Sequence, residues 1–94
     1  MKAEQIQTLH PHPDKTNKRI SVEKYTFIRK KLLEILQNSQ LTHTELMEQL
    51  YDRVKDTFDG GVQWYGETVK LDLEARKIIC RTGTNPEKYV LAKT

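Results

Sequence analysis

Residues 68–81 read TVKLDLEARKIICR, and along this stretch the spacing of the apolar residues changes from helical to strand-like. Val69 and Leu73 are four residues apart, which places both on one face of a helix. Residues 78–82 are rich in β-forming side chains. The stretch therefore predicts a helix over about residues 63–76 that passes directly into a strand.

The chain on either side of this stretch predicts a hairpin and two more helices. A second β-rich run at residues 88–91 follows a turn at residues 83–86, so the end of the sequence predicts an antiparallel hairpin. A first helix is predicted from Val22 to about Gln37. A second begins at a Thr42–Glu45 capping box and ends at the glycines of residues 59–61.

The apolar spacing also predicts which side chains form the core. The predicted core positions are Tyr25, Ile28, Leu32, Ile35 and Leu36 in the first helix, Met47, Leu50, Tyr51, Val54 and Phe58 in the second, and Val62, Tyr65, Val69 and Leu73 in the third.

The N-terminal residues predict an arm rather than part of the core. Residues 1–18 are expected to be extended, because the prolines of His10-Pro11-His12-Pro13 disfavour helix, and residues 19–94 are expected to form the domain. Arg19–Ser21 predicts a short edge strand. The expected fold class is mainly α with a small β component: three helices, a C-terminal β-hairpin and an N-terminal extended arm.

This order of elements resembles the winged helix-turn-helix fold, in which the hairpin is the wing and the third helix is the recognition helix. More specifically, the chain resembles a family of uncharacterised bacterial winged-helix proteins. The residues that carry this resemblance are His12-Pro13, Lys15, Arg19-Ile20, Tyr25, Trp64-Tyr65, Thr68-Val69 and Leu71-Asp72-Leu73-Glu74-Ala75. The resemblance implies a fold and no established activity. Lys77 stands where the pattern commonly has glycine, and a lysine in a left-handed turn is strained.

Length and composition indicate a small domain without catalytic machinery. The 94 residues suffice for one domain, and no run of about 18 apolar residues suggests a membrane span. A single cysteine, Cys80, excludes an intramolecular disulfide, favours a cytoplasmic location and is expected in the core. No phosphate-binding loop or nucleophile motif is present. We therefore expect no enzyme, no cofactor and no small-molecule substrate.

Two groups of polar residues are weak candidates for chemistry. His10 and His12 could share a metal ion, but an exposed arm lacks the outer groups that orient metal ligands, so surface histidines are the simpler interpretation. Carboxylates at residues 45, 48, 52 and 56 fall on one side of the second helix. They have no evident acid–base partner, so a solvated face is the simpler interpretation there too.

Charge is unevenly distributed, which limits where nucleic acid could bind. Residues 42–62 carry two basic and five acidic side chains (−3) and residues 63–76 carry two and three (−1), whereas the ends are basic, within a total of +3. Double-stranded DNA would have to contact the ends, because the middle repels phosphate. The candidate DNA contacts are Gln63, Glu67, Thr68 and Lys70 on the third helix, Arg81 and Lys88 on the hairpin, and Lys15, Lys18 and Arg19 on the arm.

The alternative hypothesis is a protein-interaction module or homodimer. Phe27, Trp64 and Leu71 are large apolar residues that lie off the predicted core faces. Exposed aromatic residues are typical of protein interfaces. The arm could instead fold across the domain and cover Trp64 or Phe27, and the sequence leaves both possibilities open.

Overall fold

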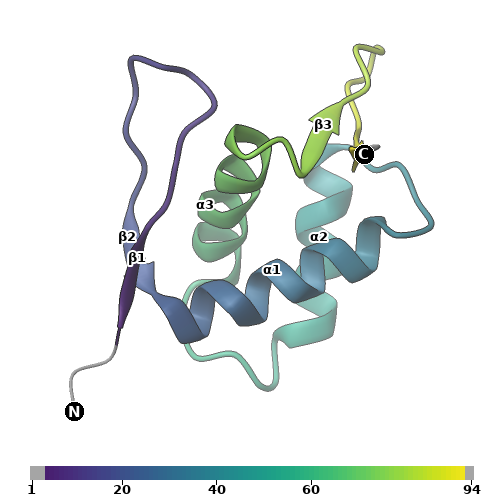
Figure 1. Ribbon diagram of the computed structural model, residues 1–94. Coiled ribbons are helices and arrows are strands. Elements are labelled where there is room, and N and C mark those ends of the chain that lie inside the picture. Colours follow the sequence, from purple (N-terminus) through teal and green to yellow (C-terminus); the bar gives the residue numbers. More distant parts are fainter. Residues whose placement is uncertain (1–3, 93–94) are drawn as a thin grey trace.

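The computed structural model describes residues 4–92 as three helices flanked by two antiparallel strand pairs (Figure 1). The elements are β1 (Gln5–Gln7), β2 (Arg19–Ser21), α1 (Val22–Leu36), α2 (His43–Val54), α3 (Val62–Ala75), β3 (Ile79–Arg81) and β4 (Tyr89–Leu91). The mainly α fold with a small β component and a C-terminal hairpin is confirmed. No helix among the described residues is long and apolar enough to cross a membrane.

The predicted helix starts are confirmed by their caps. The Ser21 hydroxyl accepts a hydrogen bond of 3.1 Å from the Lys24 N–H at the start of α1. At α2, the Thr42 hydroxyl accepts from the Glu45 N–H (3.2 Å), and the Glu45 carboxylate accepts from the Thr42 N–H (3.0 Å). These bonds satisfy backbone donors that have no partner inside the helix.

The core lies between the three helices, and all five predicted positions of α1 are buried. In α2 the prediction was partly wrong: Tyr51 is 48% exposed, whereas Leu46, which was not predicted, is fully buried. Leu46, Leu50 and Val54 follow each other at four-residue spacing, so the buried face of α2 is turned away from Tyr51.

The C-terminal hairpin closes one side of this core. Ile79 pairs with Leu91 and is buried, while the neighbouring Cys80 is exposed. The prediction of a buried Cys80 was therefore wrong, because successive residues of a strand point to opposite faces. Leu41, between α1 and α2, forms a bridge to Tyr89, so the hairpin is also joined to the helix bundle through backbone hydrogen bonds.

The turn between α3 and β3 keeps its left-handed residue although glycine is missing. Lys77 has a φ of 62°. Its N–H donates to the Glu74 carbonyl (3.0 Å) and the Ile78 N–H donates to the Leu73 carbonyl (2.9 Å). This pair of bonds is the Schellman ending of a helix. The tight helix-to-strand passage is therefore made in spite of the strain expected at Lys77.

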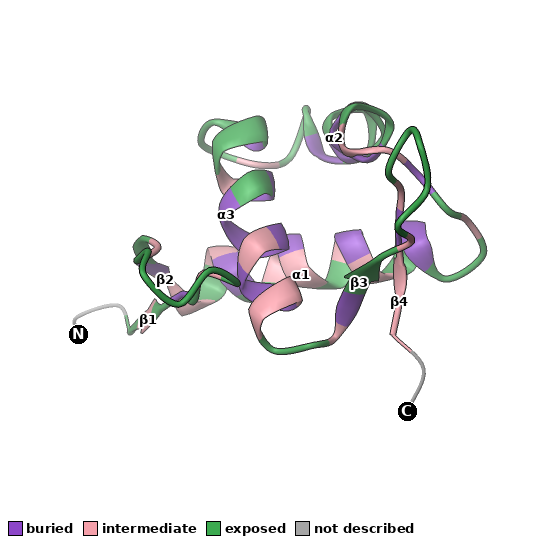
Figure 2. Cartoon of the chain, turned by 90° about the horizontal axis from the view of Figure 1, so that it is seen from above, coloured by how far each residue is buried: buried purple, intermediate pink, exposed green. Residues whose placement is uncertain are grey.

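The N-terminal segment is not an extended arm. Strand β1 pairs with β2, with Ile6 opposite Ile20, and residues 8–18 form a loop that lies beside α3 (Figure 1). The tips of both hairpins are exposed (Figure 2). The predicted edge strand at Arg19–Ser21 is confirmed, while residues 1–3 of the predicted arm lie outside the described residues.

Candidate interaction surface on helix α3

Helix α3 is covered on three sides. Its core side presents Val69 and Leu73, which are fully buried. The N-terminal loop covers a second side and the C-terminal hairpin a third. The remaining side faces solvent and carries the exposed residues Trp64 and Glu67, with Leu71 half-buried. This fourth side is the part of α3 that a partner can reach.

The N-terminal loop is attached to α3 through Asp72, which is fully buried. The Asp72 carboxylate accepts hydrogen bonds from the Leu9 N–H (2.8 Å), the Tyr25 hydroxyl (2.5 Å) and Arg76 Nε (2.9 and 3.0 Å). Burial raises the pKa of Tyr25 above its ordinary value, and the hydrogen bond to Asp72 raises that pKa further. The bond to Asp72 likewise raises the pKa of Arg76.

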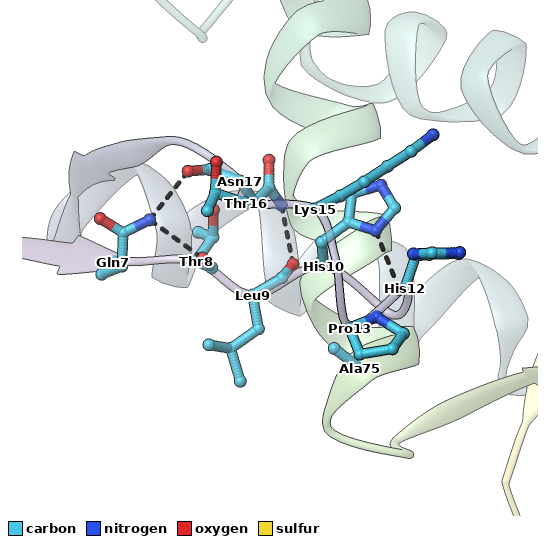
Figure 3. A pocket seen from close by; sticks show the side chains of 10 residues that line it. All are labelled: Gln7, Thr8, Leu9, His10, His12, Pro13, Lys15, Thr16, Asn17 and Ala75. Carbon is cyan, nitrogen blue, oxygen red and sulfur yellow. Dashed lines mark hydrogen bonds between the residues drawn. The ribbon is translucent and has the colours of Figure 1, made fainter.

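The base of the loop is held by Asn17. Its side-chain amide donates to the carbonyls of Leu9 and Thr68, each at 2.9 Å (the Leu9 bond is drawn in Figure 3). The Thr8 hydroxyl is buried and donates to the Lys18 carbonyl at 2.5 Å. These bonds fix the loop against α3 and leave Thr68 itself buried.

An ion pair and a cation–π contact join α3 to the C-terminal hairpin. The Lys70 ammonium lies 3.7 Å from the Glu74 carboxylate and 4.0 Å above the centre of the Tyr89 ring. Arg81, on β3, reaches the same Glu74 at 3.4 Å. Lys70 is only 4% exposed. The single basic residue within α3 is thus used to hold the hairpin.

These contacts change the set of possible DNA contacts. Thr68 and Lys70 were predicted to read base edges, but both side chains are buried and cannot reach a DNA groove in this structure. Arg81 is paired with Glu74, although its side chain is 50% exposed. The other candidates do remain accessible, but they are spread over the N-terminal loop, β2, the start of α3 and the C-terminal hairpin: Lys15, Lys18, Arg19, Gln63, Glu67 and Lys88.

The aromatic interface candidates divide into one covered residue and one exposed residue. Phe27 stacks on Phe58 with ring centres 5.8 Å apart and is half-buried, so it already has an internal partner. Phe58 contacts Tyr65 edge to face (5.2 Å), and Tyr65 contacts Trp64 in the same way (4.9 Å). The row of rings ends at Trp64, which is 48% exposed. No hydrogen bond joins the N-terminal loop to Trp64 or Phe27 in the described part of the chain.

Trp64 forms part of a cleft between α2 and α3, which we call the α2–α3 cleft. It has a volume of about 510 Å³ and is lined by His43, Thr44, Met47, Glu48, Gln63, Trp64 and Glu67. The Nδ1 atom of His43 is buried and has no hydrogen-bond partner among the described residues. Burial lowers the pKa of His43 below its ordinary value, and the charge of Lys70 lowers it further.

Sequence reasoning missed the α2 side of this cleft. Glu48 was read as part of a solvated acidic face, and Met47 only as a core residue. No local pattern marks this contact, in which Met47 and Leu50 of α2 pack against Gly66 of α3. The contact is close because Gly66 has no side chain: a Cβ there would lie 2.7 Å from Leu50.

The histidines of the N-terminal loop line a shallow depression of about 600 Å³ together with Lys15 and Ala75 (Figure 3). His10 Nδ1 accepts from the His12 N–H (3.0 Å), and His12 Nδ1 accepts from the Asp14 N–H (3.3 Å). Both Nδ1 atoms are therefore occupied by backbone contacts. Within residues 4–92, no group of three or more histidine, cysteine, aspartate or glutamate side chains is placed to hold a metal ion.

A family model described as "Family of unknown function (DUF6958)" matches residues 5–89. The chain belongs to the DUF6958 family. The DUF6958 match begins at β1 and runs to the start of β4, so it includes the N-terminal hairpin as well as the three helices. Comparison with curated proteins and with solved structures gave no match.

Proposed function

We propose that this DUF6958 chain is a non-catalytic winged-helix domain that binds another protein through the exposed side of α3. The order of three helices followed by an antiparallel hairpin supports the winged-helix assignment. The hairpin is also joined to the segment before α2 by the bridge between Leu41 and Tyr89. Since a fold does not determine a function, the assignment of function rests on the surface of α3.

The observation that carries the proposal is the chemistry of that surface. Trp64 is 48% exposed beside the carboxylate of Glu67, while Lys70, the only basic residue of α3, is buried under Tyr89. A recognition helix that enters DNA lies between rows of phosphates, where an exposed carboxylate is repelled. An exposed tryptophan is instead typical of protein interfaces.

The buried carboxylates support the absence of catalysis. Asp72 is hydrogen-bonded to Tyr25, Arg76 and the Leu9 backbone. Glu74 is ion-paired with Lys70 and Arg81, and its buried Oε1 forms no hydrogen bond within residues 4–92. A general acid or base must have access to a substrate proton. Both carboxylates instead connect elements of the fold.

DNA binding is the second candidate, because cations flank α3 on both sides, three of them exposed and Lys88 half-buried. Lys15, Lys18 and Arg19 lie on the N-terminal hairpin and Lys88 on the C-terminal one, and none of these four forms an ion pair within residues 4–92. Such residues could contact phosphates without any contribution from the exposed side of α3.

A titration with a labelled random-sequence duplex, at low and at moderate salt, separates the two candidates. The proposal predicts no binding at moderate salt, and capture of a protein partner that is retained by Asp14→Asn and lost by Trp64→Ala. Asp14 is the control because it is exposed in the N-terminal loop, outside the α3 surface that carries Trp64. Tight duplex binding that falls steeply with salt and weakens when Lys15 and Lys18 are both replaced by alanine would overturn the proposal.

A further inference from the structure

The lining of the α2–α3 cleft carries negative charge. Glu48 from α2 and Glu67 from α3 both line it and are exposed, and neither forms an ion pair with another described residue. Its lining contains no lysine or arginine. Asp52 lies one helical turn beyond Glu48 and is also exposed. The cleft is therefore bordered by negative charge that the fold itself does not neutralise.

The ring of Trp64 packs against Tyr65 on its inner side. Its ring meets Tyr65 edge to face at 4.9 Å, and Tyr65 in turn contacts Phe58 and the ammonium of Lys24. Trp64 is nonetheless 48% exposed. A fixed, accessible indole is the best aromatic platform for a cation, because its face carries negative potential.

The groups of the cleft that a ligand can reach suit a cation. His43 lies at the start of α2, but its Nδ1 is buried and has no partner in the described part of the chain, so the groups open to a ligand are the two carboxylates and the indole. Carboxylates and an aromatic face receive guanidinium or ammonium donors.

We infer that the α2–α3 cleft binds a cationic peptide segment, with an arginine or lysine side chain placed over Trp64 between Glu48 and Glu67. This inference rests on the proposed function and specifies its partner. An acidic segment or a phosphate would be repelled by the two carboxylates. A purely apolar helix would bury them without partners, which is costly. A volume of about 510 Å³ suffices for one such side chain and part of its backbone.

The experiment measures binding of a labelled Gly/Ser-rich peptide containing several arginines by fluorescence anisotropy. The matched peptide carries citrulline, which has the shape of arginine without the charge. Trp64 is the only tryptophan of the chain, so its emission reports binding at the cleft directly. We expect binding of the arginine peptide, a change in Trp64 emission, weaker binding at high salt, and little binding of the citrulline peptide.

Variants test the residues individually. We expect Glu48→Gln with Glu67→Gln to weaken binding by roughly three- to tenfold, which is the range for two exposed ion pairs. Trp64→Ala should weaken it by roughly threefold or more through the lost cation–π contact. Asp14→Asn, which removes the same charge from the N-terminal loop, should leave it unchanged. All four residues are exposed, so the variants are expected to fold.

The outcomes distinguish this inference from the proposed function. Equal binding of the arginine and citrulline peptides, or equal weakening by Asp14→Asn and by the double variant, would overturn the cationic inference and leave a protein-binding role standing. Absence of peptide binding together with a Trp64 emission change on adding duplex DNA would overturn both.

Discussion

The carboxylate of Asp72 accepts a hydrogen bond of 2.8 Å from the backbone of Leu9, a residue 63 positions earlier in the chain. The same carboxylate bonds Tyr25 on α1 and Arg76 at the end of α3. One buried side chain therefore connects the N-terminal loop, the first helix and the third helix. Buried charges of this kind are tolerated only when their partners are present.

Replacing Asp72 with alanine should strongly destabilise the fold. The change leaves the Tyr25 hydroxyl and the Leu9 N–H without partners, so we expect the free energy of unfolding to fall by about 3 kcal/mol. Denaturant unfolding followed by circular dichroism measures this. Glu67→Ala, on the exposed side of the same helix, is the control and should change stability by less than about 0.5 kcal/mol. Equal effects of the two variants would show that Asp72 has no special role.

Replacing Gly66 with alanine should destabilise the contact between α2 and α3. The new Cβ would lie 2.7 Å from Leu50 Cδ2 and 3.0 Å from Met47 Sδ, so these buried side chains must move from their places in the core. We expect a loss of about 1–3 kcal/mol, which is typical of overpacking. Gly61→Ala is the control, since a Cβ there meets Trp64 Cβ at an ordinary 3.5 Å. A neutral Gly66→Ala in chemical denaturation would mean that the contact is not tight.

Local sequence patterns predicted the helices because their signals lie within the elements themselves. The Thr42–Glu45 capping box and the four-residue apolar spacing of α1 correspond directly to the observed start of α2 and the buried face of α1. The C-terminal hairpin was predicted from two β-rich runs around a glycine turn.

The N-terminal loop and the cleft could not be predicted in this way, because both depend on contacts between residues distant in sequence. Nothing near Thr68 or Lys70 shows that Asn17 and Tyr89 will cover them, so two buried residues were taken for exposed DNA contacts. Only Trp64 was identified correctly as an accessible apolar residue, and its neighbours across the cleft were not.

Replacing Lys77 with glycine should stabilise the protein. Lys77 holds a φ of 62°, which costs a side-chain-bearing residue about 1 kcal/mol relative to glycine. Glycine is also more flexible in the unfolded chain, so the net gain expected is about 0.5 kcal/mol or slightly more. Thermal and denaturant unfolding measure it. Lys77→Ala removes the same charge but keeps the strain, so it should give no gain, and a gain in both variants would point to charge instead.

His43 should make stability depend on pH near neutrality. Burial, followed by the charge of Lys70, lowers its folded-state pKa, so the unfolded chain takes up a proton first as the pH falls. The contribution of neutral His43 is complete above the unfolded pKa of about 6.5 and is lost as the pH falls from there through the folded pKa. Unfolding free energies measured from about pH 7.5 down to about pH 5.5 should therefore decrease, and the decrease should be smaller in His43→Gln. His12→Gln, a change in the exposed N-terminal loop, is the control and should retain the wild-type decrease. If His43→Gln retained the full decrease, His43 would not be the source of the pH dependence, and its position at the α2–α3 cleft would not favour the neutral imidazole.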